Sequence, residues 1–161
     1  QYNLRKGMYS LDNLWDGLGA IVIDNPDVEY LFGKVTMYPH YDPVARDLVL
    51  FFLEKFFPGP DKLLTPKDRL PLKMDNGTLE SIFNAATYEE NYKILVQKVR
   101  AQNENIPPLV NAYMSLSATM RTFGTSLNRG FGNVEETGII ITVRDIHDIK
   151  KDRHILTYRK D

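Results

Sequence analysis

Residues 28–57 read VEYLFGKVTMYPHYDPVARDLVLFFLEKFF, and this stretch decides the fold class because it joins a strand pattern to a helix pattern. Its first ten residues are rich in β-branched and aromatic side chains, which predicts a strand. Within that strand, Gly33 indicates a bulge or a close approach of another group. Asp42-Pro43 then predicts a helix start, because the aspartate accepts free backbone N–H groups and proline suits the first helical position.

This helix extends to Phe57, where Pro58-Gly59-Pro60 ends it. Its apolar residues cover more than one stripe, so we expect it to be packed on two sides. Upstream, apolar residues recur at three- and four-residue steps from Gly7 to Ile23 and predict another helix. The order helix, strand, helix indicates a mixed α/β fold.

The rest of the chain predicts a long connection, short helices and two further strands. Residues 61–77 mix prolines and charges without periodicity, so we expect a surface connection there. Three helices are expected from start signals and periodicity: about 79–85, from the Thr87 capping box to about 102, and 109–116 after Pro107-Pro108. Two strands are expected at 119–125 and at 138–144, and the second, GIIITVR, lacks alternation and predicts cover on both faces. The charged tail from Asp145 is expected to be peripheral.

Composition narrows the functional classes. The chain has 161 residues, suited to one domain, with 43% hydrophobic and 25% charged residues. The balance of 20 Lys+Arg against 21 Asp+Glu predicts no nucleic-acid partner.

The absence of cysteine excludes disulfides and thiolate chemistry and suits a reducing compartment. No apolar run approaches the ~20 residues of a membrane span, so we expect no transmembrane segment. Because the chain begins with Gln1, we expect a processed protein or a piece of a longer one.

A cationic segment stands at the start of the first predicted helix. Arg5-Lys6-Gly7 places two cations and a glycine where helical N–H groups have no partner, and such an end can bind phosphate. The alternative is a solvated Arg-Lys pair, because the glycine pattern matches no P-loop or dinucleotide fingerprint.

Two side chains are candidates for proton transfer. His40 follows the end of a predicted strand, where general bases often lie, and the alternative is a loop histidine near a helix cap. Tyr113 follows the double proline and can donate a proton, and the alternative is a tyrosine that only packs and hydrogen-bonds. The histidines, His40, His147 and His154, have no metal-ligand spacing, so no metal is predicted. No serine lies in a Gly-x-Ser-x-Gly elbow, which leaves a serine hydrolase unsupported.

Several segments resemble one family. LDNLWDGL at 11–18, YLFGKVTM at 30–37 and IPPLVNAY at 106–113 are similar to the bacterial acyltransferases of the GNAT superfamily that carry the inherited name hemolysin. FGNV at 131–134, followed by the strand 138–143, fits the same pattern. That family includes the N-acyltransferases that make ornithine and glycine lipids, and the resemblance is to the glycine-lipid type of Bacteroidetes. It covers about residues 11–154.

The resemblance implies a fold and a domain organisation. Residues 1–161 would form one α/β domain with an α+β mixed sheet, the carboxyl-terminal half of a GNAT fold, with a helical insertion at about 61–105. Arg5, Lys6 and Gly7 would become the phosphate loop for the acyl donor, although of the usual Gln/Arg-x-x-Gly-x-Gly/Ala pattern only Gly7 can be matched. The first half of a GNAT would lie upstream of Gln1, so we expect pairing with an amino-terminal segment or with a second copy.

The resemblance also implies a reaction. We expect transfer of a fatty acyl group, 3-hydroxylated, from acyl carrier protein or CoA to the amino group of a small amino acid such as glycine, in lipid biosynthesis. The donor is a substrate and no cofactor is expected to be bound permanently. His40 would act as base and Tyr113 as acid. The expected location is cytoplasmic, with peripheral contact at the inner membrane.

Two alternatives come from other classes. A membrane-damaging hemolysin is suggested by the inherited name, but it would need a long amphipathic or apolar insertion element. A non-catalytic interaction module would use residues 61–77 and the basic positions Lys150, Lys151 and Arg153 to contact acidic carrier protein or anionic lipid. Interleaved aspartates weaken that basic patch.

Overall fold

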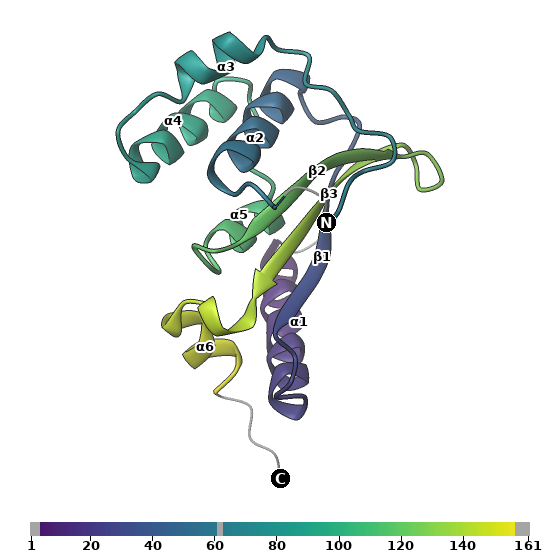
Figure 1. The fold of residues 1–161 in the computed structure, drawn as a ribbon, viewed down its shortest axis with the longest axis vertical. Coiled ribbons are helices and arrows are strands. Elements are labelled where there is room, and N and C mark those ends of the chain that lie inside the picture. The colour runs from purple at the N-terminus through teal and green to yellow at the C-terminus, as the bar shows by residue number, and fades with distance from the viewer. Residues whose placement is uncertain (1–3, 61–62, 157–161) are drawn as a thin grey trace.

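A computed structural model describes residues 4–60 and 63–156 and contains a small antiparallel sheet covered by helices. Its elements follow in the order α1 (Leu4–Asp24), β1 (Tyr30–Met37), α2 (Pro43–Phe56), α3 (Asn76–Ile82), α4 (Tyr88–Arg100), α5 (Pro108–Met114), β2 (Arg121–Asn128), β3 (Val134–Thr142), a 3-10 turn (Val143–Asp145) and α6 (Asp148–His154). The predicted combination of helices with a sheet is confirmed, and each predicted helix and strand is present with shifted ends (Figure 1). The sheet is not mixed as expected, because both strand pairs among the described residues are antiparallel.

The three strands have the spatial order β1-β3-β2, and both neighbouring pairs are antiparallel. The last strand of the chain therefore lies in the middle. The pairing of β2 shifts between Thr122 and Thr125, where Gly124 has a φ of +80°. The outer side of β2 is bridged to Pro58 and Arg69, whereas β1 pairs only with β3 among the described residues.

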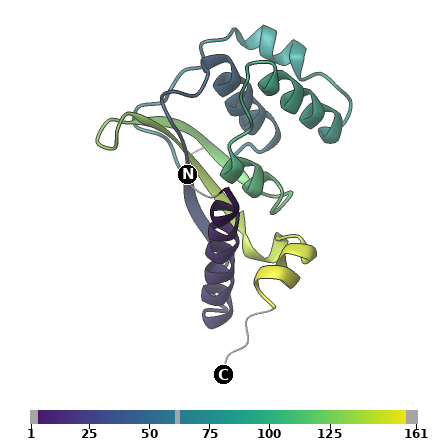
Figure 2. The ribbon, with the colours of Figure 1, turned by 180° about the vertical axis from the view of Figure 1, so that it is seen from behind.

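Helices α1 and α5 cover one face of the sheet and lie in front of it in Figure 2. Successive β1 residues alternate between faces, so Met37 is buried while Tyr30 and Phe32 are 54% and 59% exposed. On the covered face, a Cβ added to Gly33 would come within 3.2 Å of the phenol oxygen of Tyr113. Gly33 thus marks the predicted close approach, and β1 itself has no bulge.

Helix α2 lies between the sheet and α4, which confirms the expected packing on two sides. Nine consecutive residues, 45–53, are buried, and aromatic rings fill the space toward α4. Both helices begin as predicted: the Asp42 side chain accepts from Val44 and Ala45, and Thr87 forms a capping box with Glu90. Local capping signals therefore determine where α2 and α4 begin.

A buried charged cluster ties α2 to two distant segments. Asp47 is 0% exposed; its Oδ1 accepts from Arg46 Nε at 2.8 Å, and its Oδ2 accepts the backbone N–H groups of Lys73 and Met74 at 2.6 and 2.7 Å. Arg46 also donates to Glu135 of β3 at 3.0 Å. Burial alone lowers the pKa of Arg46, but its hydrogen bonds to Asp47 and Glu135 outweigh burial and raise that pKa. The guanidinium therefore stays charged.

The expected surface connection is anchored in its second half. Leu70 donates its backbone N–H to the carbonyl of Thr125 of β2 at 2.8 Å, and Asp47 accepts the N–H groups of Lys73 and Met74. Residues 61–62 lie outside the described part of the chain.

The prediction that the strand at 138–144 is covered on both faces is wrong. In β3 the buried residues Thr137, Ile139 and Ile141 alternate with half-exposed ones, so one face is covered by helices and the other is partly open. The continuous β-branched run reflects a central position in the sheet, where both edges of the strand are paired.

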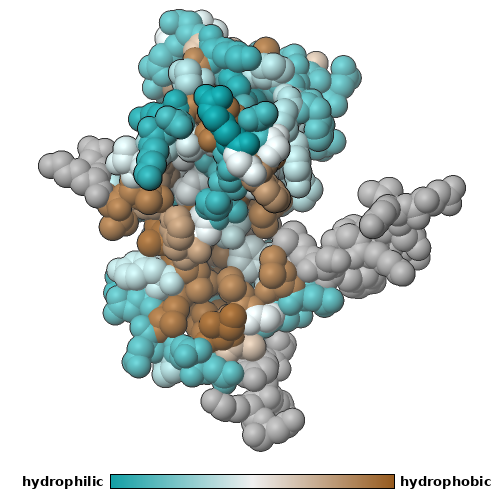
Figure 3. All heavy atoms as spheres, turned by 90° about the vertical axis from the view of Figure 1, so that its right-hand side faces the viewer, coloured by the Kyte–Doolittle hydropathy of each residue, from teal (hydrophilic) through white to brown (hydrophobic). Residues whose placement is uncertain are grey.

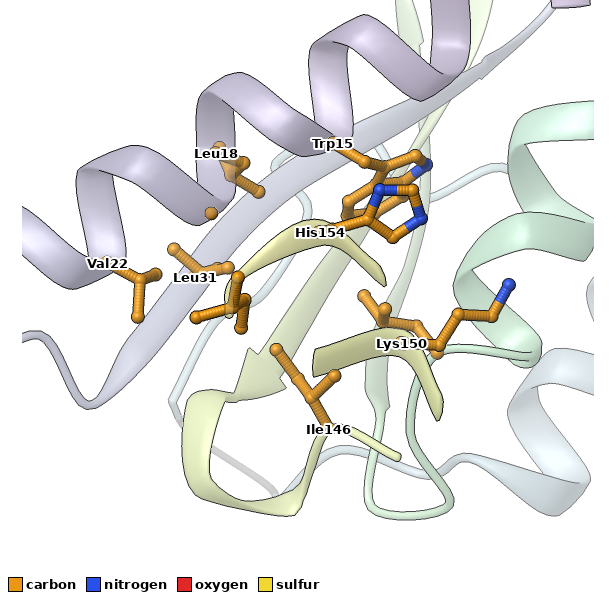
Figure 4. A pocket seen from close by; sticks show the side chains of 10 residues that line it. Trp15, Leu18, Val22, Leu31, Ile146, Lys150 and His154 are labelled. Atoms are coloured by element: carbon orange, nitrogen blue, oxygen red, sulfur yellow. The ribbon is translucent and has the colours of Figure 1, made fainter. Parts of the chain in front are cut away.

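The prediction of a peripheral tail from Asp145 onward is also wrong, because α6 packs against α1. His154 is buried, and its Nδ1 lies 2.7 Å from Asp16 Oδ1. The backbones approach so closely that a Cβ on Gly19 would lie 1.7 Å from the carbonyl oxygen of His154. Helices α1 and α6 and strand β1 line a small apolar pocket of about 20 Å³ (Figure 4). Because most residues of α6 are charged, its sequence predicts an exposed segment and does not indicate the side that packs on α1.

Candidate functional site

An open groove of about 660 Å³ lies at the carboxyl end of β1. Four segments line it: α1, the end of β1 with the loop after it, the connection after α4, and the start of α5. The lining residues are Leu14, Thr36, Met37, Tyr38, His40, Tyr41, Glu104, Asn105, Pro107, Pro108 and Leu109. Because α1 and β1 run in opposite directions, the start of α1 lies at this same end of the sheet (Figure 1).

The wall opposite β1 is shaped by the way α4 ends. Asn103 adopts a left-handed φ of 59°, and the N–H of Glu104 donates back to the carbonyl of Val99 at 3.3 Å, which stops the helix. The next residues run to Pro107 and Pro108, which begin α5. This short connection leaves Glu104 and Asn105 in the groove.

Two hydrogen bonds join this wall to the loop after β1. The Tyr41 hydroxyl donates to the carbonyl of Asn105 at 2.9 Å, and the backbone N–H of Asp42 donates to Glu104 Oε1 at 3.2 Å. Burial and the nearby carboxylates of Glu104 and Asp42 raise the pKa of Tyr41, so its phenol remains a donor.

His40 lies in the groove, as expected for a residue that follows the strand. Its ring is exposed and stacks on Tyr38, with ring centroids 5.8 Å apart and planes 14° apart. This stacking favours one orientation of the imidazole and leaves its edge open to a ligand.

Tyr113 lies outside the groove lining, one turn after Leu109 on α5. Its ring meets Trp15 edge-on at 5.4 Å, and its hydroxyl lies against Gly33. Burial raises the pKa of Tyr113, so the phenol is protonated at neutral pH and suits a proton donor rather than a base. The structure therefore puts His40 in the groove and Tyr113 beneath β1 next to it, without bringing them into one cavity.

Arg5, Lys6 and Gly7 belong to the first turns of α1, which begins at Leu4. The predicted loop is thus helical, because no residue there breaks the helix. The first four N–H groups of a helix have no intrahelical acceptor, so those of residues 4–7 are at the helix start. The side chains of these three residues lie outside the described part of the structure.

Three further features concern the alternative functions: metal binding, membrane-spanning helices and the basic residues of the tail. Within residues 4–60 and 63–156, no group of three or more His, Asp or Glu is arranged to hold a metal ion. No described helix is long and apolar enough to cross a membrane. Of the basic tail positions, Lys151 donates to the carbonyl of Arg144 at 2.7 Å and Lys150 lines the pocket beneath α1. The Lys151 cation is therefore engaged within the chain, which weakens the basic patch of the interaction-module alternative.

Glu104 lies in this groove and is not among the residues that the sequence patterns predict there. Its signals were present: Asn103 favours a left-handed helix end, and Pro107-Pro108 forces a short connection. What the sequence does not reveal is that this connection faces the end of β1, more than sixty residues away.

The proteins that match this chain are acyltransferases. The chain is 54% identical over 155 residues to the glycine N(alpha)-acyltransferase of Phocaeicola vulgatus, a match that covers 96% of this chain and 48% of that protein. It is 53% identical over 153 residues to the glycine N(alpha)-acyltransferase of Bacteroides thetaiotaomicron, covering 95% of this chain and 45% of that one. The chain therefore spans about half the length of the curated relatives it matches. Both relatives are named glycine N(alpha)-acyltransferases, which confirms the resemblance to that type of acyltransferase drawn from the sequence segments.

No protein-family model matches this chain, and no solved structure matches it significantly.

Proposed function

We propose that the protein containing this chain transfers an acyl group to the amino group of a small amino acid such as glycine. The observation that carries the proposal is the 54% identity, over nearly the whole chain, to a relative named glycine N(alpha)-acyltransferase. The proposed acyl group is a fatty, 3-hydroxylated chain, delivered by acyl carrier protein or CoA, and its product enters lipid biosynthesis. The proposed location is cytoplasmic, with peripheral contact at the inner membrane.

We further propose that residues 1–161 are one domain, the carboxyl-terminal half of a GNAT-like fold. The order α1, β1, α2, β2, β3 supports this, since the resemblance implies a strand, a helix and two closing strands after a phosphate-binding helix start. Helices α3 and α4 fit the insertion proposed at about 61–105.

The surface beside β1 supports pairing of this half with another segment. Strand β1 is an edge of the sheet among the described residues. Apolar atoms gather in the lower part of the molecular side that carries β1 (Figure 3), and the exposed apolar residues include Leu14 and Ile21 of α1 and Tyr30 and Phe32 of β1. An unpaired strand edge next to exposed apolar residues is suited to a partner strand. The proposed partner is the amino-terminal half of the same protein, or otherwise a second copy.

The proposed reaction is direct aminolysis of a thioester. The amino acid first gives its ammonium proton to solvent, and the neutral amine then attacks the thioester carbonyl carbon. A C–N bond forms, the C–S bond breaks, and the sulfur leaves as a thiolate that takes up a proton. His40 takes the proton that the nitrogen loses. Tyr113 lies outside the groove, so its proton reaches the thiolate through a water chain, and exchange with solvent restores both groups. No covalent enzyme intermediate is needed.

Removal of either proton-transfer group should slow turnover. We expect His40→Gln and Tyr113→Phe each to lower kcat by about 100-fold, the usual contribution of a positioned acid or base. Steady-state kinetics with saturating glycine and acyl donor measure this effect. His147→Gln and Tyr30→Phe are the matched controls, because both residues are exposed and lie outside the groove lining. A variant that keeps its kcat would remove that residue from the mechanism.

The cations at the start of α1 should contribute to binding of the acyl donor. We expect the double variant Arg5→Ala, Lys6→Ala to raise the KM for the acyl donor about 10-fold and to leave the KM for glycine unchanged, because each phosphate contact contributes to donor binding alone. Titration of donor and acceptor in turn separates the two constants. An unchanged donor KM would exclude both residues from the donor site.

One assay tests the proposed function against its alternatives. The protein at its natural length is incubated with acyl carrier protein carrying a labelled 3-hydroxyacyl chain and with glycine or other amino acids, and N-acylated product is detected by mass spectrometry. Product with glycine is the expected result. The enzyme proposal fails if no amino acid yields product. Release of dye from vesicles would then favour the hemolysin, and binding of carrier protein without product would favour the interaction module.

A further inference from the structure

Glu104 is the carboxylate-bearing residue among those that line the groove. The other ionisable side chains there are Tyr38, His40 and Tyr41. The remaining surface comes from apolar residues, prolines and two uncharged polar residues. The groove therefore presents one negative charge beside one imidazole.

Glu104 is held in position but not neutralised. Its Oε1 accepts the backbone N–H of Asp42 at 3.2 Å, and its own N–H is tied to Val99. Among the described residues no lysine, arginine or histidine forms an ion pair with it. The carboxylate acts on Tyr41 instead, whose phenol it helps to keep protonated. A half-exposed carboxylate without a cationic partner, next to apolar walls, is suited to a cationic ligand.

We infer that Glu104 binds the amino group of the acceptor in this groove. The inference rests on the proposed function, which supplies an acceptor that carries an ammonium group at neutral pH. The second carboxylate oxygen accepts a hydrogen bond from that group, which brings the nitrogen into the groove that also holds His40. Glu104 is thus a positioning residue that sets which acceptors bind. The bound ammonium gives one proton to solvent before attack, and the proton that the nitrogen loses after attack still leaves through His40.

The variant Glu104→Gln isolates the charge, because its amide oxygen can still accept from the N–H of Asp42. We expect the KM for glycine to rise about 10-fold, since a charge-assisted hydrogen bond becomes a neutral one, while the donor KM is unchanged. Calorimetry should show the same loss for glycine binding and no loss for glycolate, which has a hydroxyl in place of the amine. The conservative Glu104→Asp should retain more of the affinity.

Glu89→Gln is the matched control, because this exposed glutamate lies at the other end of α4, away from the groove. This variant should leave the KM for glycine, the KM for the acyl donor and the affinity for glycine unchanged. Equal glycine affinity in Glu104→Gln and the unaltered protein would overturn the inference, as would an equal loss for glycolate. If the unaltered protein makes no N-acylated product, the proposed function fails, and the calorimetric comparison of glycine with glycolate still decides the role of Glu104.

Discussion

Asp47→Ala should lower the free energy of unfolding by about 4 kcal/mol, the usual cost of removing one partner from a buried ion pair. The carboxylate is fully buried, and four hydrogen bonds end on it: two from the guanidinium of Arg46 and two from the backbone of the 73–74 segment. Its loss leaves a buried cation with Glu135 as its remaining charged partner, and two partly buried backbone N–H groups lose their acceptor. Urea denaturation followed by circular dichroism measures the change.

The matched control for Asp47 is an ion pair on the surface. Glu54 accepts from Arg69 at 2.9 Å, and both side chains are well exposed, at 37% and 64%. Glu54→Ala should therefore cost less than about 1 kcal/mol. Similar losses in the two variants would show that the Arg46–Asp47 pair has no special role, and the account of the 73–74 segment as an anchored connection would be wrong.

The elements that the sequence predicts best are those whose ends depend on neighbouring residues. Asp42-Pro43 and the Thr87–Glu90 capping box define helix starts within four residues, and the structure contains both. Features that depend on distant residues were predicted less well. The middle position of β3 follows from pairing with β1, about a hundred residues away, and the buried side of α6 follows from contact with α1.

The same distinction applies to the candidate site. His40 could be placed because a residue just after a strand lies at the sheet end, and that is where the groove is. Glu104 could not, because its place depends on how the end of α4 meets the loop after β1. The contact of Gly33 with Tyr113 could be predicted only in part. A glycine in a strand predicts a close approach but does not identify the neighbouring residue.

Gly19→Ala should cost about 3 kcal/mol, the upper range for inserting a methyl group into a packed interior. The added Cβ would lie 1.7 Å from the carbonyl oxygen of His154, and 2.7 Å from its carbonyl carbon. Both atoms are backbone, so no side-chain rotation relieves the overlap, and α6 must move away from α1. That movement also separates His154 from Asp16 and opens the pocket beneath Trp15. Hydrogen exchange of the α6 amides and urea denaturation together report the displacement and its cost.

Gly17→Ala is the matched control on the same helix, two residues away. Nothing lies within 4 Å of a Cβ at this position, so the methyl group meets open space. Alanine is also the better helix former, and the variant should gain about 1 kcal/mol of stability in a helix interior. Opposite signs for two identical substitutions therefore distinguish steric contact with α6 from helix propensity. If Gly19→Ala were stabilising as well, the close packing of α6 on α1 would be wrong, and the expectation of a peripheral tail would regain support.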